Sequence, residues 1–392
     1  MTANPHISNS LVGRWAAATV RPVSGISDRH TLHTYFNVSP ESPDGRYIVF
    51  FASRERSGER GDVVVLDRES GVERVAAADI AAEDAHRAAC QQWALGSRFV
   101  VYHEPVGTRW RVKAWERETG RTRILADGWQ LGFGTPCANP SVPWVPVYGC
   151  HWNPGDHRDF AVVNVETGEL RTVCSLETAA AAAPADWLLD TFGPEGPGSV
   201  FFPVLSHDGS RAFFKLARGR GGDDWRSPRA SIREGKVVVD VATGRPLRFF
   251  RTWGHPSWRP DGAAILEKGN IVQDIATGKT SSLAPIPTDH PSFSPDGRLF
   301  TSDGKEDKET FEQTGIRVVS VATAASGPRP LSALVWRGVD TLGAASWRRP
   351  HLHPVFSPDS NRLYFNVSDG PWTRLHVAEA APPPQPRNKD TP

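Results

Sequence analysis

Several features that would point to common functional classes are missing from this chain of 392 residues. No run approaches the roughly 20 apolar residues that a membrane-spanning helix needs, and residues 1–6 have neither the basic start nor the apolar core of a signal peptide. The formal net charge is only +1, so there is no electrostatic reason to expect binding to nucleic acid or to an anionic membrane. We therefore expect a cytoplasmic protein that acts on neither.

Cysteine and helical segments are also scarce. The four cysteines show no spacing typical of a metal site, which favours reduced thiols, with a single disulfide as the alternative; they are Cys90, Cys137, Cys150 and Cys174. No Gly-x-Ser-x-Gly motif is present, which argues against a hydrolase that joins a propeller to an α/β domain. Only residues 77–89 and 177–189 have a locally helical composition, and each could equally be a loop. The chain is therefore expected to be built mainly of strands.

One turn recurs along the sequence. Its copies resemble Ser-Pro-Asp-Gly and lie at 42–45, 206–209, 259–262, 294–297 and 357–360. Proline fixes φ at the first central position, aspartate bonds back to the backbone and glycine accepts a positive φ. A short apolar run follows each copy, and a second turn that ends in glycine closes several units, at 67–71, 116–120, 165–168, 241–244 and 275–278. This order predicts a strand, a turn, a strand, a hairpin and a further strand in each unit.

The spacing of these turns predicts the architecture. The long gap between Asp44 and Asp208 has room for two weaker units, near 93–103 and 151–163, which makes about seven units in total. We therefore predict an all-β fold, a seven-bladed β-propeller over residues 31–379. Residues 1–30 are expected to form an edge segment that wraps a blade or closes the ring, and residues 380–392 a disordered tail. A pair of β-sandwiches is the main alternative, but two different turns recurring in phase favour the propeller.

Histidines occupy equivalent places in several units. They lie in the segments 254–258, 289–293 and 351–356, each just before a turn of the repeat. Equivalent positions of successive blades face the same end of the channel, so His255, His290 and His353 should converge, with His351 beside them. Three imidazoles at one point suit a divalent transition metal. The alternative for any one of them is a hydrogen bond to the neighbouring blade.

The residues of the second half resemble a known family. Segment 351–359, followed by 366–370, resembles the last blade of oligogalacturonate lyases, and 289–297 resembles the blade before it. The segment from Tyr35 to Phe50 resembles their first blade. In that family three histidines and a glutamine hold a manganese-type ion. The resemblance therefore implies that His290, His351 and His353 bind a divalent metal ion (Mn, Ca or Zn), although residues 347–350 contain no glutamine.

The first half resembles a neighbouring group, the propeller lyases that act on ulvan or on rhamnose–glucuronate linkages. The segments that carry this resemblance are 86–93, 102–104 and 148–152. Those lyases use two histidines and a tyrosine from such places, which implies catalytic roles for His86, His103 and Tyr148. Tyr35 and Gln92, which lie in the matching segments, are candidates for substrate binding. The alternatives are polar filling of the channel for the histidines and a buried structural hydroxyl for Tyr148.

Lyase chemistry explains why such residue types would be needed. A uronate lyase removes the proton at C5 and expels the oxygen at C4, so the adjacent carboxylate charge must be offset by a metal or an arginine. A base must reach C5–H and an acid must reach O4; histidine can take a proton near neutral pH. His255 is expected to hold or protonate the sugar. The arginines of one loop could clamp the carboxylate, Arg229 among them: Arg218, Arg220, Arg226, Arg229 and Arg233.

The sequence thus predicts a lyase that cleaves a uronate-containing oligosaccharide or polysaccharide by β-elimination, with its site in the central channel. The alternative is a non-catalytic propeller that binds a glycan or a protein. The His-x-His-Pro pair at 351–354 favours the lyase, because a scaffold needs no convergent imidazoles.

Overall fold

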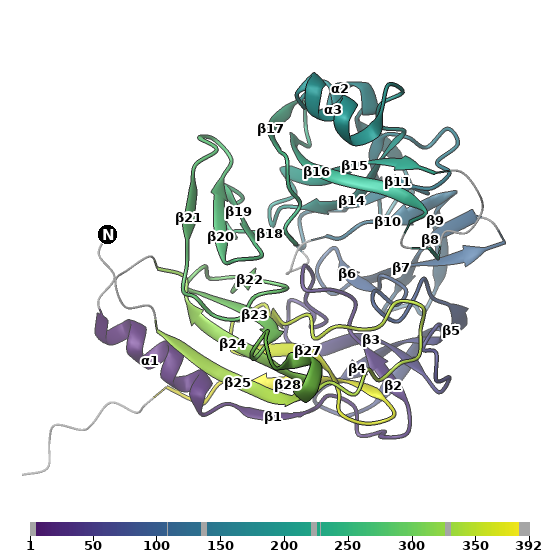
Figure 1. The fold of residues 1–392 in the computed structure, drawn as a ribbon. Coiled ribbons are helices and arrows are strands. Elements are labelled where there is room, and N and C mark those ends of the chain that lie inside the picture. The colour runs from purple at the N-terminus through teal and green to yellow at the C-terminus, as the bar shows by residue number, and fades with distance from the viewer. Residues whose placement is uncertain are drawn as a thin grey trace, which may run out of the picture.

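Seven four-stranded antiparallel sheets form a ring in the computed structural model (Figure 1). The structure describes residues 5–107, 109–134, 139–220, 226–227, 229–325 and 331–383, with side chains from residue 11 onward. The predicted seven-bladed β-propeller is confirmed. The expected disordered tail lies mostly outside the described residues, which end at Pro383.

The first four blades follow one another along the chain. Blade 1 consists of β2 (His30–Leu32), β3 (Tyr47–Ser53), β4 (Arg60–Asp67) and β5 (Glu73–Ala81). Blade 2 consists of β6 (Gln92–Ala94), β7 (Phe99–Val106), β8 (Arg109–Glu116) and β9 (Thr122–Asp127). Blade 3 consists of β10 (Trp129–Leu131), β11 (Trp144–Gly149), β12 (Phe160–Asn164) and β13 (Leu170–Cys174). Blade 4 consists of β14 (Ser199–Leu205), β15 (Arg211–Gly219), β16 (Ser231–Asp240) and β17 (Pro246–Phe250).

The remaining three blades complete the ring. Blade 5 consists of β18 (Ser257–Trp258), β19 (Ala264–Glu267), β20 (Ile271–Asp274) and β21 (Thr280–Ser282). Blade 6 consists of β22 (Ser292–Phe293), β23 (Leu299–Lys305), β24 (Ile316–Thr323) and β25 (Ser332–Val339). Blade 7 combines β26 (Val355–Phe356), β27 (Arg362–Ser368) and β28 (Thr373–Glu379) with β1 (Thr19–Pro22).

The Ser-Pro-Asp-Gly turns connect the first and second strands of their blades. In blade 1 the Ser42 hydroxyl donates to Asp44 Oδ1 at 2.5 Å and accepts from the backbone N–H of Tyr47 at 2.9 Å. The serines at 206, 294 and 357 make the same two hydrogen bonds. Gly45 takes φ +75°, which a residue with a Cβ rarely adopts. One local hydrogen-bond pattern therefore fixes the same end of four blades.

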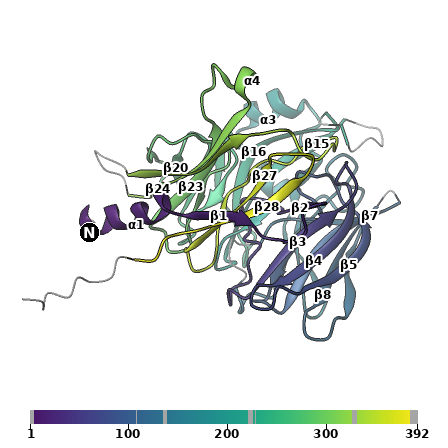
Figure 2. The same cartoon turned by 90° about the horizontal axis from the view of Figure 1, so that it is seen from below.

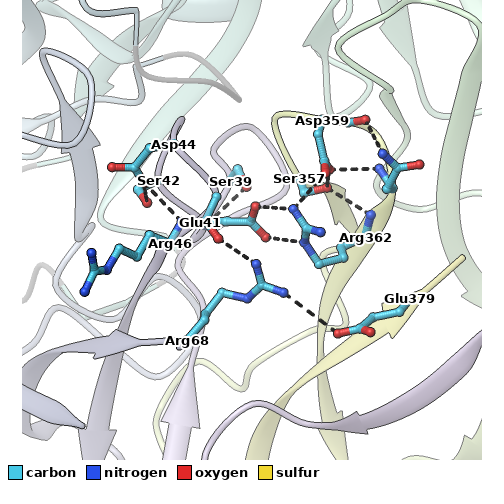
Figure 3. Close-up of polar contacts among 12 residues, drawn as sticks. Ser39, Glu41, Ser42, Asp44, Arg46, Arg68, Ser357, Asp359, Arg362 and Glu379 are labelled. Carbon is cyan, nitrogen blue, oxygen red and sulfur yellow. Dashed lines mark hydrogen bonds and ion pairs between the residues drawn. The ribbon is translucent and has the colours of Figure 1, made fainter. Parts of the chain in front are cut away.

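The ring closes between blades 7 and 1. β1 pairs antiparallel with β28, with Thr19 opposite Glu379, so a strand from the N-terminal segment completes the last sheet. At this seam the Glu41 carboxylate is buried and accepts from Arg362 at 2.6 and 2.7 Å (Figure 3). It also accepts from the Tyr364 hydroxyl. Covalent connection, strand pairing and a buried ion pair therefore all join the two ends of the ring.

Helices are short and peripheral. α1 (Pro5–Ala16) was not anticipated by the sequence; it lies along β25 and β24 (Figures 1 and 2), with Trp15 buried edge-on against Phe356 at 5.5 Å. The helical composition at 177–189 corresponds to α2 (Leu176–Ala180) and α3 (Ala185–Phe192). Residues 77–89 instead continue β5 and then form a loop. A single turn, α4 (Phe311–Thr314), follows β23.

Two expectations from composition can be compared with the structure. No described helix is long and apolar enough to cross a membrane. The three cysteines that the structure describes are free thiols, at positions 90, 150 and 174; Cys137 lies outside the described residues.

The seam between blades 7 and 1 provides the first testable prediction. Arg362→Met leaves the buried Glu41 carboxylate without its cation, and breaking such a pair costs about 3–5 kcal/mol. We expect a large fall in the urea midpoint of unfolding. The matched control is Arg46→Met. Arg46 lies at the equivalent turn of blade 1 and pairs with Asp67, but its side chain is exposed, so its loss should change the midpoint little. Equal effects of the two substitutions would contradict the role given to the buried pair.

Candidate active site

Five histidines gather at the end of the channel opposite the Ser-Pro-Asp-Gly turns. They come from the loop before β6 and from the segments that lead into β18, β22 and β26, and they are His86, His255, His290, His351 and His353. Each of those inner strands begins at this end of the ring. The equivalent placement that the repeat predicted therefore brings histidines from separate blades to one location.

The four imidazoles at the centre of this group are in contact. The His353 ring centroid lies 4.6 Å from that of His86, 4.5 Å from that of His290 and 5.6 Å from that of His351. The His86 and His351 centroids are 4.5 Å apart. One nitrogen from each of His86, His351 and His353 lies within 4.8 Å of the other two. The sequence had grouped His290, His351 and His353. In the structure this group of ring nitrogens contains His86 in place of His290, and the His290 ring contacts those of His351 and His353.

Hydrogen bonds fix the tautomers of three rings. Nδ1 of His86 lies 3.0 Å from the Arg349 carbonyl, and Nδ1 of His255 lies 2.9 Å from the Asp289 carbonyl. A carbonyl only accepts, so both Nδ1 atoms carry hydrogen and both Nε2 atoms keep a lone pair. Nδ1 of His290 is held by the Asp303 carboxylate at 2.9 Å. A carboxylate behind a histidine is the usual support of a metal ligand.

The last two rings have unusual surroundings. Nδ1 of His351 lies 3.4 Å from Nε2 of His290. His353 is fully buried, yet neither of its ring nitrogens has a hydrogen-bond partner among the described residues. Leaving a buried polar atom unpaired is costly, so this ring is better explained as the ligand of a metal ion than as packing.

Burial lowers the pKa of four of these imidazoles and so keeps them neutral. It lowers the pKa of His351 to about 3 and that of His255 to about 4, with a further lowering from neighbouring His290. Burial also holds the pKa of His86 and of His353 well below the usual range. Neutral imidazole is the form that binds a metal. The orphaned nitrogens of His353, the all-nitrogen donors and the Asp303 support together fit a divalent transition metal.

Several non-glycine residues around the cluster have a left-handed backbone, including Ala88 and Cys90 on the loop that carries His86. His255 and His353 adopt φ +52° and +50°, a left-handed conformation that costs a non-glycine residue about 1–3 kcal/mol. Each is followed by a proline, and an inner strand begins at the next residue. The loop that carries His86 is fixed differently, because Asp84 Oδ1 accepts from the backbone N–H groups of His86 and Arg87 at 2.8 Å.

A segment of blade 1 crosses the channel beneath the cluster. Thr34 donates to the Gln91 carbonyl at 2.9 Å, and Asn37 donates to the Pro256 carbonyl at 3.2 Å, so residues 33–38 contact blades far apart in the ring. Tyr35 lies on this segment, 4.6 Å from the His353 ring. Burial raises the pKa of Tyr35 to about 12, so its hydroxyl stays protonated at neutral pH.

A basic pocket adjoins the histidines. Its volume is about 320 Å³, and its walls include Tyr35, His255, Trp253, Phe201 and Phe202. Its charged lining residues are four cations and one acid: Lys215, Arg220, Arg233, Arg348 and Glu234. This excess of positive charge suits an anionic ligand. Arg348 occupies the stretch where the resemblance to oligogalacturonate lyases placed a glutamine ligand.

His103 and Tyr148, both predicted to be catalytic, belong to a second buried group that does not line this pocket. Nδ1 of His103 accepts from the backbone N–H of Leu131 at 3.0 Å, so its Nε2 carries hydrogen and points to Glu83 Oε2, 3.6 Å away. Glu83 is paired with Arg87. His103 therefore has neither a free lone pair nor access to the pocket, and the tyrosine ring packs behind Phe201 at 5.5 Å.

Of the three predicted substrate-binding residues, one lines the pocket and two do not. Tyr35 lines the pocket. Gln92 is buried and ties blade 2 to blade 3, because its amide donates to the Gly132 carbonyl at 2.9 Å and accepts from the Gly134 backbone N–H at 2.6 Å. Arg229 is exposed on its loop and does not line the pocket. Of the loop arginines, Arg233 and Arg220 do.

Several residues of the site were not singled out by sequence reasoning. They include Lys215, Trp253 and Asp303. A signal existed for two of them: Lys215 interrupts the apolar run 212–217, and Asp303 ends the run that follows the turn at 294–297. A charged residue within a buried strand indicates a special environment. Nothing in the local sequence distinguished Trp253 from the other tryptophans.

Comparisons with known proteins agree on the fold. No family model and no curated protein sequence matches the chain. Among solved structures, an oligogalacturonate lyase in complex with manganese is similar, with a TM-score of 0.61 and 15% identity over 94% of this chain and 97% of that chain. An oligogalacturonate lyase from Vibrio parahaemolyticus gives 0.61 and 14% over 92% and 97%. A chain of the mitotic checkpoint complex gives 0.52 and 12% over 93% and 95%.

These identities show a shared fold alone. Because the same fold is found in lyases and in a component of a protein assembly, the arrangement of side chains must decide between the two functions.

Metal binding can be measured without any substrate. We expect the protein to bind Mn²⁺ in equilibrium dialysis and His353→Ala to lose this binding. Asp303→Asn should weaken it by about 10–100-fold, because the support of His290 is lost. The control is His157→Ala, which removes a histidine stacked on Trp129 at 4.3 Å outside the cluster. Unchanged Mn²⁺ affinity in His353→Ala would contradict the assignment.

Proposed function

We propose that this protein is a lyase that cleaves a uronate-containing oligosaccharide by β-elimination. The observation that carries the proposal is the contact between two sites: a cluster of neutral histidines that fits a divalent metal and a pocket lined by four cations. His255 belongs to both, because it lines the pocket and its ring stacks on His290 at 4.7 Å. A non-catalytic scaffold has no need for this arrangement.

The basic residues account for recognition of the substrate. A uronate carboxylate in the pocket meets Arg233 and Arg348, and guanidinium groups bind carboxylates through paired hydrogen bonds. Burial and the neighbouring Arg348 and Arg87 lower the pKa of Arg233 to about 10, so the group remains charged at neutral pH. Trp253 and Tyr35 offer aromatic surface to the sugar ring.

The histidines account for the reaction. His86, His290, His351 and His353 would hold the metal, which when bound withdraws charge from the carboxylate and so makes the C5 proton more acidic. His86 would take the place of the glutamine in the related family. His255 Nε2, which keeps its lone pair because Nδ1 donates to Asp289, takes the C5 proton. We assign His86 to the metal instead of to proton transfer, and His103 and Tyr148 to the supporting structure.

The proposal is tested by incubating the protein with Mn²⁺ and a panel of uronates: 4-linked oligogalacturonates, rhamnose–glucuronate oligosaccharides and ulvan oligosaccharides. Cleavage by elimination leaves a C4=C5 double bond that absorbs in the ultraviolet. We expect at least one panel member to give this product. His255→Ala should lower kcat by about 10²–10⁴-fold while the bound Mn²⁺ stays unchanged.

The control for His255→Ala is His207→Ala, which removes a histidine from the turn at 206–209 at the opposite end of the ring and should keep full activity. If the parent binds a uronate but forms no unsaturated product, the protein is a glycan-binding propeller. Normal turnover in His255→Ala would remove this residue from the mechanism.

A second measurement addresses the carboxylate. Arg233→Met should raise KM for a cleaved uronate by about 10–100-fold, because a charge-assisted hydrogen bond contributes about 1.5–3 kcal/mol. Arg218→Met is the matched control. Arg218 lies on β15, pairs with the exposed Glu195 and does not line the pocket, so its loss should leave KM unchanged. A KM that does not respond to Arg233→Met would place the carboxylate elsewhere.

A further inference from the structure

Lys215 lies on β15, at a point where the hydrogen-bond register with both neighbouring strands is irregular. On one side the β14–β15 register shifts between Phe201 and Val204, and on the other the β15–β16 register shifts between Phe214 and Leu216. Such irregularities redirect a side chain out of the regular pleat and are frequent beside active sites. Here they present Lys215 to the pocket, in the middle of a strand whose other residues at 212–217 are buried.

The ammonium of Lys215 faces the pocket without an ion pair to any residue that the structure describes. Its Nζ lies 4.5 Å from the centroid of the Trp253 ring, and the Trp253 ring is held edge-on by Phe202 at 5.7 Å and by Phe213 at 5.6 Å. Among the described residues no carboxylate lies within ion-pair distance of it. Lys236, the next lysine along the chain, shows the contrast, because it is paired with Glu267. A positioned but unpaired amine facing a pocket is available to a ligand.

We propose that Lys215 is the proton donor to the leaving sugar oxygen, the partner of His255 in the elimination. This inference rests on the proposed function and goes beyond it, because it names the acid that the reaction requires. Lys215 and His255 line the same pocket, and Lys215 lies close enough to His255 to lower the pKa of that imidazole.

The step balances with these two groups alone. The C5 proton goes to Nε2 of His255, and the electrons of the C5–H bond form the C4=C5 double bond. The C4–O4 bond breaks and its electron pair stays on O4, which takes a proton from the Lys215 ammonium. The products are an unsaturated uronate and a sugar with a free anomeric hydroxyl. His255 then carries one proton more and Lys215 one fewer, and exchange with water restores both.

The electrostatic surroundings suit this role. Burial, followed by the charge of Arg233, lowers the pKa of Lys215 to about 7, and an acid works best when its pKa is near the working pH. The charged and titratable groups around Lys215 come from several blades: Arg233, Glu234 and Lys236 of β16, Arg348 before β26, Arg87 before β6, His151 after β11 and His255 before β18. Since the donor must be protonated, activity should fall as pH rises through about 7.

The decisive variant is Lys215→Arg, which keeps the positive charge but holds its proton too tightly to donate it. On a cleaved disaccharide of the panel we expect kcat to fall by about 10²–10⁴-fold with KM within a few-fold of the parent. The fall in activity with rising pH near 7 should disappear. Lys305→Met is the control, since that lysine also rests on an aromatic ring, Phe311 at 4.2 Å, but outside the pocket.

A second substrate separates proton donation from binding. A uronate that carries a 4-nitrophenyl group on O4 releases a stabilised anion that needs no proton, so Lys215→Arg and Lys215→Met should cleave it within a few-fold of the parent rate. If Lys215→Arg keeps the parental kcat on the disaccharide, Lys215 only binds the anion and the inference is wrong. Equal losses on both substrates also overturn it. A parent that cleaves neither substrate overturns the proposed function itself.

An independent readout needs no catalysis. An amine with a pKa near 7 is largely deprotonated at pH 7.5 and reacts with an acylating reagent before ordinary lysines do. Peptide mapping should find Lys215 labelled ahead of Lys305, and digalacturonate should protect it. Labelling of Lys215 no faster than that of Lys305 would remove the chemical basis of the inference even if the protein is a lyase.

Discussion

Closure of the ring between blades 7 and 1 is the constraint on which the candidate site depends. His351 and His353 lead into blade 7, His86 follows blade 1, and Tyr35 belongs to blade 1 itself. The contacts among these residues exist only when the two ends of the chain are joined. The β1–β28 pairing and the buried pair of Glu41 with Arg362 therefore hold together the histidine cluster as well as the fold.

Charge is the second constraint, and it works against stability. Arg87, Arg233 and Arg348 all lower the pKa of Lys215, and Arg87 and Arg348 also lower that of Arg233. Mutual repulsion of partly buried cations raises the free energy of the folded state, and a bound carboxylate relieves it. A pocket that is unfavourable when empty and favourable with an anion selects anionic ligands over neutral ones.

The sequence predicted the architecture because each blade repeats a local hydrogen-bond pattern that needs particular residues. Ser42, Asp44 and Gly45 are required by the turn itself, so the pattern is visible in the sequence. The convergence of His255, His290 and His353 followed from symmetry. The roles of His86 and His103 did not follow, because they depend on how the loop at 82–91 folds over the channel, and one hydrogen bond from Leu131 decides which nitrogen of His103 is protonated. Lys215 is presented to the pocket by a register shift that no motif encodes.

The two ends of the propeller are stabilised by different means. The Ser-Pro-Asp-Gly turn is the most visible motif of the sequence, but it lies at the end opposite the candidate site and therefore indicates little about function. At the turn end, serine and aspartate side chains satisfy the backbone, and the positive φ falls on glycine in blades 1, 4, 5 and 6 and on Ser360 in blade 7. At the histidine end, the positive φ falls on His255 and His353, and both ring nitrogens of His353 lack a partner among the described residues. Strain and unsatisfied polar groups persist only where the surrounding structure enforces them. The hydrogen bonds of the turn end therefore stabilise the fold enough to tolerate buried histidine nitrogens that lack hydrogen-bond partners when no ligand is bound.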